Sequence, residues 1–170
     1  MNTMRKMLLV LLLLACCFSL SGCMLMGAMI LGGDNDAVSK EEIYTYVAQN
    51  SEALGAFPYE AYQGDVNAGK SEAAVLAAVL GQDTIVKSVA QCDPDVLQFY
   101  CGGSGNVTSS AYCGFYYSEK DIPCAFEFEQ EAQLTQTSEG AYEWRSADQQ
   151  RAFVTERIVP KWFWYYQLWN

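Results

Sequence analysis

The spacing of apolar residues changes at Ile85, and this change limits the folds open to the chain. Before Ile85, two segments carry apolar residues at helical spacing; after it, short runs alternate apolar and polar residues with a period of two. Helices followed by short strands and turns predict an α+β domain. We expect one or two N-terminal helices packed on an antiparallel β-meander sheet.

The two helical segments have recognisable ends. Ser39 and Glu42 form a capping box ahead of a helix that Gly55 ends. Ser71 is placed to cap a second, alanine-rich helix, which ends at Gly81. We expect the first helix to pack on the domain's own sheet rather than on a partner, because its apolar residues fall on one face.

Turn-forming residues divide the second half of the chain into short strands. The glycine-rich stretch 102–106 lacks the lysine of a phosphate-binding P-loop and precedes a strand-like segment, so we expect a wide connection between strands. Residues 57–69 are interrupted by Pro58, Gly64 and Gly69 and predict no regular element. The expected strands are 85–90, 96–100, 111–118, 124–128, 141–145, 149–158 and 162–168.

Leu20-Ser21-Gly22-Cys23 matches the lipobox of bacterial lipoproteins, in which a peptidase cuts before the cysteine and the thiol carries acyl chains such as palmitate. Arg5 and Lys6, followed by an apolar run, form the signal ahead of it. Two acyl chains give stable anchoring. The sequence predicts a signal peptide over 1–22, a lipidated tether over 23–38 and one extracytoplasmic domain over 39–170.

An uncleaved membrane helix is the alternative anchor. The run after Cys23 is also apolar, so residues 7–31 contain no charge and are long enough to span a bilayer. Both kinds of anchor leave the basic N-terminus inside and the acidic flank outside. The domain is therefore expected on the outer face of the cell membrane in either case.

The charge of the chain restricts its partners. It has 20 acidic and 10 basic residues, a formal net charge of −10, and no basic stripe. Nucleic-acid binding requires such a stripe and is excluded. The expected partners are the membrane, through the lipid anchor, and an envelope protein or glycan.

The absence of histidine removes the commonest catalytic and metal-binding chemistry. There is no Ser–His or Cys–His nucleophile and no His-ligated zinc. Cys92, Cys101, Cys113 and Cys124 lack the CxxC spacing of a zinc site, but outside the cytoplasm they can form disulfides in any of three pairings, or stay as buried thiols. We predict no catalytic residue, metal or cofactor, and a protein that is not an enzyme.

Glu127, Glu129 and Glu131 alternate with apolar residues and would share one face of a strand. Three carboxylates can bind a hard cation, yet the residue pattern of a calcium loop is missing, so we expect a solvated sheet face. A carboxylate-based hydrolase is the least favoured function, because no particular acid pair is indicated.

Five consecutive aromatic residues near the C-terminus are the best candidate for a binding surface. In a strand, Trp162, Trp164 and Tyr166 face one way, and Phe163, Tyr165 and the nearby Trp169 face the other. One face can fill the core, which leaves the other to stack on a glycan or bury against a protein. We predict a binding module that uses either face; the alternative is a structural or inhibitory lipoprotein in which both faces are covered.

Four segments of the domain carry a family resemblance. They are 39–43 with Val47 and Asn50, 99–105, 112–118, and 155–158 with the aromatic residues from Trp162 onward. In these segments the chain resembles small uncharacterised envelope lipoproteins of gut Clostridia, of Lachnospiraceae and Ruminococcus type. The resemblance implies a Gram-positive surface location. It implies no activity and no catalytic residue.

Overall fold

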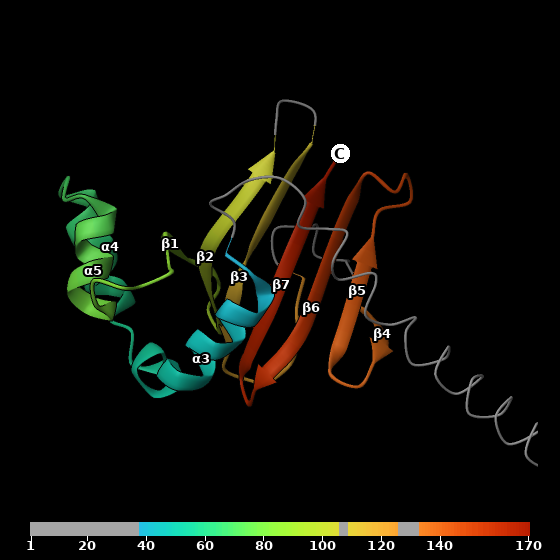
Figure 1. Cartoon of the computed structure of the whole chain (residues 1–170), viewed down its shortest axis with the longest axis horizontal. Coiled ribbons are helices and arrows are strands. Elements are labelled where there is room, and N and C mark those ends of the chain that lie inside the picture. Colours follow the sequence, from blue (N-terminus) through green and yellow to red (C-terminus); the bar gives the residue numbers. More distant parts are fainter. Residues whose placement is uncertain (1–37, 106–108, 126–132) are drawn as a thin grey trace, which may run out of the picture. The chain divides into compact units, whose positions relative to one another are not determined.

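The computed structural model describes residues 38–105, 109–125 and 133–170, which all fall in the unit Asp36–Asn170. Within this described part, the helices come first: α3 (Lys40–Gly55), α4 (Tyr59–Asn67) and α5 (Glu72–Leu80) (Figure 1). None of them is long and apolar enough to cross a bilayer. The strands are β1 (Ser88–Asp93), β2 (Val96–Gly105), β3 (Ser110–Ser118), β4 (Thr135–Ser138), β5 (Ala141–Arg145), β6 (Arg151–Val159) and β7 (Trp162–Trp169).

The α+β class is confirmed, and the strands form one sheet in the order β1-β2-β3-β7-β6-β5-β4. Every neighbouring pair is antiparallel. The strands β1 to β3 form one meander and β4 to β7 another, and the two join where β7 pairs with β3. The expected meander is therefore correct within each half and wrong at the junction, where the chain leaves β3 and returns at the far edge as β4.

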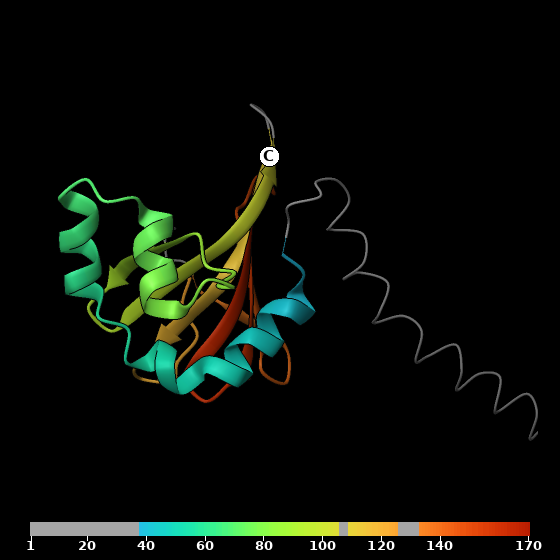
Figure 2. The same cartoon turned by 60° about the vertical axis from the view of Figure 1, so that its left-hand side comes forward.

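The first helix forms as its capping box predicts. The Glu42 N–H donates to Ser39 Oγ at 3.2 Å. Ile43 and Val47 are fully buried on the face of α3 that packs against the sheet (Figure 2). Lys40 extends this contact with an ion pair of 2.7 Å to Glu156 on β6. Packing on the domain's own sheet is confirmed for this helix.

Helix α4 lies in the stretch for which no regular element was expected. Pro58 precedes its first residue, a place where the missing proline N–H is harmless. Tyr62 is the buried side chain of the helix: its ring packs on Phe57, and its hydroxyl accepts from the Val89 N–H at 3.1 Å. Tertiary contacts through one residue thus outweigh the weak local propensity.

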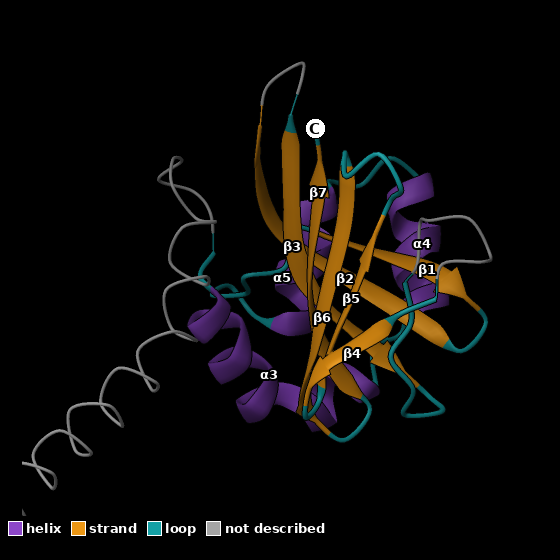
Figure 3. Ribbon diagram, turned by 90° about the vertical axis from the view of Figure 1, so that its right-hand side faces the viewer, coloured by secondary structure: helices purple, strands orange, loops and turns teal. Residues whose placement is uncertain are grey.

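The sheet has a hydrophobic core on each face. On the helix side, the rings of Phe99 and Phe115 stack with their centroids 4.8 Å apart. On the other side, Tyr116 and Phe163 stack at 5.2 Å, and Leu134 from the β3–β4 connection packs against this second core. Figure 3 shows the strands of the sheet from this direction. The central strands are therefore covered on both faces over part of their length.

The observed strand ends match the expected ones where the sequence has clear turn-forming residues. They differ in the glycine-rich stretch after Tyr100. The strand expected over 141–145 matches β5, and 111–118 differs from β3 by one residue. The expected loop over 102–106 is wrong for its described residues, because β2 continues through Gly105. The expected strand over 124–128 is wrong for Cys124 and Ala125, which are irregular; the rest of it lies outside the described residues.

Candidate functional site

The predicted aromatic row on β7 is covered by the fold. Trp162 and Tyr166 retain 3% and 7% of their exposure and belong to the helix-side core. Trp164 is half-buried under the first turn of α3, where Lys40 Nζ lies 4.6 Å from its ring centroid. The three residues therefore do not form an exposed row on this face, because α3 packs against β7.

The opposite face of β7 is covered only in part. Phe163 and Tyr165 are fully buried in the second core. Farther along the strand, Trp169 keeps 37% of its exposure, and Tyr112 on the adjacent β3 keeps 39%. An exposed aromatic surface therefore exists at this end of the sheet.

This surface lines a hollow of about 550 Å³ across β1, β2, β3 and β7, within the size range of small-molecule sites. Its strand residues alternate with those of the helix-side core, so the hollow lies on the face of the sheet opposite the helices. We call it the aromatic hollow. It is lined by Ser88, Ala90, Gln98, Tyr100, Ser110, Tyr112, Tyr165, Gln167 and Trp169.

Two glycines leave the space in which its rings lie. Gly114 is paired with both Tyr100 and Tyr165, and a Cβ on it would lie 2.9 Å from the Tyr165 ring. Gly103 is paired with Tyr112, and a Cβ there would lie 3.1 Å from atoms of both Tyr100 and Tyr112. Aromatic rings thus fill positions over glycine on neighbouring strands.

The lining combines ring faces with amides and hydroxyls and carries no side chain charged at neutral pH. The rings of Tyr100 and Tyr112 are 6.1 Å apart, and burial raises the pKa of Tyr100. Gln98 Nε2 donates to Tyr165 Oη at 2.8 Å, which fixes the orientation of that amide. Gln167 is also buried in the floor. The hollow therefore presents neutral donors and acceptors between aromatic faces.

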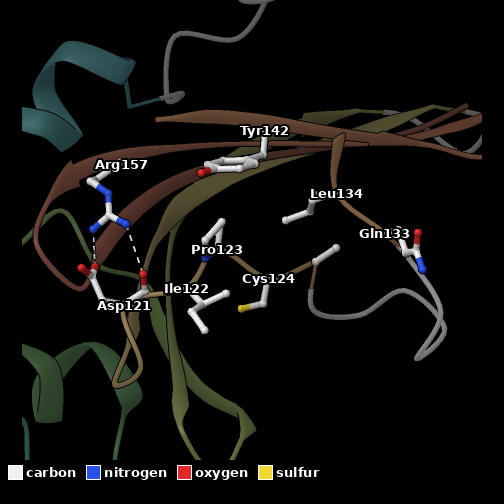
Figure 4. Close-up of a pocket in the computed structure, with 9 residues that line it drawn as sticks. Asp121, Ile122, Pro123, Cys124, Gln133, Leu134, Tyr142 and Arg157 are labelled. Atoms are coloured by element: carbon white, nitrogen blue, oxygen red, sulfur yellow. Dashed lines mark hydrogen bonds and ion pairs between the residues drawn. The ribbon is translucent and has the colours of Figure 1, made fainter. Parts of the chain in front are cut away.

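A second hollow, of about 790 Å³, lies beside the β3–β4 connection (Figure 4). In its wall, Arg157 is ion-paired with the Asp121 carboxylate and donates to the Asp121 carbonyl oxygen at 3.1 Å. The Lys161 N–H donates to the same carboxylate at 2.5 Å, and these bonds lower the pKa of Asp121. These polar groups are engaged with one another, and they hold the turns after β3 and β6 together.

Cys124, in the same wall, is a poor nucleophile. Burial raises the pKa of its thiol to about 11, so the thiol stays protonated at neutral pH. Cys101 and Cys113 are buried on the other face of the sheet, under α3, and all three are thiols in the structure. Cys92 is exposed on β1, and its thiol donates to Gln98 Oε1 at 3.4 Å. The predicted cysteines thus divide between the two faces of the sheet.

Two groups of predicted residues lie outside the described part of the chain: Leu20-Ser21-Gly22-Cys23, and Glu127, Glu129 and Glu131. Among the residues that are described, no cluster of three acidic or cysteine side chains could hold a metal ion. Sequence reasoning missed Gln98, Tyr100, Tyr112 and Gln167. The tripeptide Tyr-Cys-Gly occurs at 100–102 and at 112–114, and this repeat could have indicated Tyr100 and Tyr112.

Comparison of the chain with protein-family models, with curated proteins and with solved structures gives no match. The assignment of the site therefore rests on its geometry and chemistry.

Proposed function

We propose that the protein is a lipid-anchored component of the outer face of the cell membrane, and that its domain binds a neutral saccharide in the aromatic hollow. The observation that carries this proposal is the composition of the lining. Tyr112 and Trp169 offer exposed ring faces, and the half-buried Ser88, Tyr100 and Ser110 offer hydroxyls beside them.

A saccharide fits this combination better than other small ligands. Its C–H faces pack on aromatic rings, and its hydroxyls exchange hydrogen bonds with amides and hydroxyls. The uncharged lining gives no cationic partner to a phosphate or carboxylate, and the formal charge of −10 repels anionic polymers. We infer a β-linked oligosaccharide, since its sugar rings present flat apolar faces.

The lining favours binding over hydrolysis. Glycoside cleavage uses two carboxyl groups, roughly 5–9.5 Å apart. None of the nine side chains that line the aromatic hollow is a carboxylate. A saccharide bound here would therefore be held without being cut.

The lipobox supports the proposed location. Replacing Cys23 by alanine removes the only thiol at the predicted cleavage site, so we expect Cys23→Ala to lose labelling by radioactive palmitate and to accumulate as an uncleaved precursor. A variant that is still cleaved and labelled would contradict the lipoprotein assignment. A protein that is unlabelled and uncleaved even in the wild type would indicate the uncleaved membrane helix instead.

Saccharide binding can be tested on the full chain purified in detergent. We expect at least one of cellotetraose, chitotetraose and xylotetraose to bind in calorimetry, and the variants Tyr112→Ala and Trp169→Ala each to bind about tenfold or more weakly. Val79→Ala is the matched control, because Val79 is an exposed apolar residue on α5, outside the hollow. Equal binding by all variants, or none by the wild type at millimolar concentration, would overturn the proposal.

A further inference from the structure

The two Tyr-Cys-Gly tripeptides, 100–102 on β2 and 112–114 on β3, lie side by side and have the same arrangement. In each, the tyrosine lines the aromatic hollow and the cysteine is buried in the helix-side core. Both central cysteines therefore lie on one face, directly behind the tyrosines.

A β-bulge brings the two cysteines opposite each other. The β2–β3 register pairs Tyr100 with Gly114 and then Gly102 with Cys113, so Cys101 is the extra residue. In a bulge, two residues of one strand oppose a single residue of its partner, here Cys113. Side chains opposite each other in antiparallel strands have Cβ atoms about 4.5–5.5 Å apart. A disulfide requires about 3.5–4.5 Å, so closure requires a shift of roughly an ångström.

The surroundings of the two thiols suit a disulfide. Cys101 and Cys113 are both buried, and their contacts with protein oxygens are long: 3.9 Å to the Phe99 carbonyl and 3.7 Å to the Val38 carbonyl. A disulfide is apolar and requires no hydrogen bond, so forming it gives up only these two long contacts. Burial raises the pKa of both thiols, and the nearby charge of Lys87 opposes that rise.

The division of the cysteines between the faces selects one pairing. The Cys92 thiol donates a hydrogen bond to Gln98, which lines the aromatic hollow. Cys124 packs against the second core. Both therefore lie on the face opposite Cys101 and Cys113. Joining either of them to Cys101 would take the bond through the sheet.

We propose that Cys101 and Cys113 form a disulfide in the exported protein, and that this bond holds the two tripeptides in the register that forms the aromatic hollow. The bond forms by exchange with the disulfide of an oxidoreductase outside the membrane. One thiolate attacks that disulfide, and the second thiol then displaces the oxidoreductase from the mixed disulfide. The two cysteines lose two protons and two electrons, and the oxidoreductase becomes a dithiol.

The bond itself does not depend on the proposed saccharide ligand, whereas its effect on binding does. The bond would sit directly behind Tyr100 and Tyr112, and fixing their strands reduces the ordering that a ligand must impose. Reduction is therefore expected to weaken saccharide binding about three- to tenfold without changing any residue of the hollow.

Peptide mapping tests the bond on the full chain taken from membranes, alkylated in denaturant without reductant and then digested. We expect one cross-linked peptide containing Cys101 and Cys113, lighter by two hydrogens than the two thiol peptides, and alkylated Cys124. Complete alkylation of Cys101 and Cys113 would overturn the proposal, as would linkage of either to Cys92 or Cys124.

The role of the disulfide in binding is tested by calorimetry with cellotetraose, chitotetraose and xylotetraose. The oxidised wild type is compared with the double variant Cys101→Ala/Cys113→Ala, and Cys124→Ala is the matched control. We expect weaker binding in the double variant alone. A cross-linked peptide combined with unchanged affinity would overturn the role in binding. If no oligosaccharide binds, the proposed function is contradicted, whereas peptide mapping still shows whether Cys101 and Cys113 form a disulfide. Should the double variant not fold, the wild type incubated with and without dithiothreitol gives the same comparison.

Discussion

Gly114 shows how one missing side chain shapes the molecule. A Cβ at this position would lie 2.1 Å from the Phe99 carbonyl oxygen and 2.9 Å from the Tyr165 ring. We expect Gly114→Ala to force β2 and β3 apart and to lower the free energy of unfolding by about 1–3 kcal/mol in urea titrations. Gly64→Ala is the control: the site in α4 is open, and alanine should stabilise the helix by about 0.5–1 kcal/mol.

The carboxylate of Asp121 makes the stability of the domain depend on pH. Its carboxylate accepts from the Lys161 N–H and pairs with Arg157, and these bonds lower its pKa in the folded state. A lowered folded pKa contributes stability above the unfolded value, about 3.9, and that contribution is lost as the pH falls through the folded pKa. We expect Asp121→Asn to be less stable than the wild type at pH 7 by about 1 kcal/mol or less, because the pair is partly exposed.

Asparagine tolerates the positive φ of 58° at this position, so backbone strain should not obscure the effect. Urea titrations between pH 7 and pH 2.5 should show the difference shrinking toward zero at the acid end. A difference that is constant across this range would show that the charge of Asp121 is not its cause. Asp83→Asn, at an exposed turn, serves as the control.

Residue-scale prediction failed where exposure depends on distant parts of the chain. The alternation of Trp162, Phe163 and Trp164 on one strand was read correctly from the sequence, and both faces were expected to hold aromatic rings. Which face is covered depends on α3, more than a hundred residues earlier, whose Lys40 lies over Trp164. No periodicity within the strand contains that information.

Helix α3 is the element whose packing the sequence predicts best, and its buried face can be tested directly. Ile43 is fully buried against the sheet, so Ile43→Ala should lower the free energy of unfolding by about 2–5 kcal/mol. Gln49→Ala, on the exposed face of the same helix, should change it by less than about 0.5 kcal/mol. Similar urea midpoints for both variants would contradict the packing of α3 on the sheet.

Elements with strong local signals were predictable, and elements defined by tertiary contact were not. The capping box at Ser39 and the turn before Ala141 fixed the starts of α3 and β5. Helix α4 has no comparable signal; it is held through Tyr62. The end of β2 was also missed, because Gly102 and Gly103 suggest a loop unless a neighbouring strand is known to supply rings.

The sheet is completed by the pairing of β3 with β7, which no local sequence pattern predicts. Strand β7 joins β3 rather than β1 or β4, and this brings Trp169 and Gln167 beside Tyr112. The proposed class of function, binding through aromatic residues, rests on composition, whereas the proposed site depends on this long-range register. Helix α3 packs against β7, β3 and β6, and this packing covers the aromatic residues on the helix side of β7.

The charge distribution of the molecule yields a last prediction. A neutral oligosaccharide in an uncharged hollow has no net Coulomb interaction with a protein of formal charge −10, so its affinity should not change with ionic strength. We expect whichever of cellotetraose, chitotetraose and xylotetraose binds to keep its dissociation constant within about twofold between low and high salt, and tetragalacturonate not to bind at low salt.

Binding of tetragalacturonate would also be informative, because Arg151 lies near Trp169, a residue that lines the aromatic hollow. The Arg151 guanidinium is 5.9 Å from the ring centroid of Trp169 and equally far from that of Trp144. Tetragalacturonate binding that weakens with salt and is lost in Arg151→Gln would show that this cation selects acidic sugars, and would contradict the neutral ligand. Salt-independent binding of the neutral oligosaccharide in both the wild type and Arg151→Gln would instead place recognition on the aromatic rings and uncharged polar groups of the hollow.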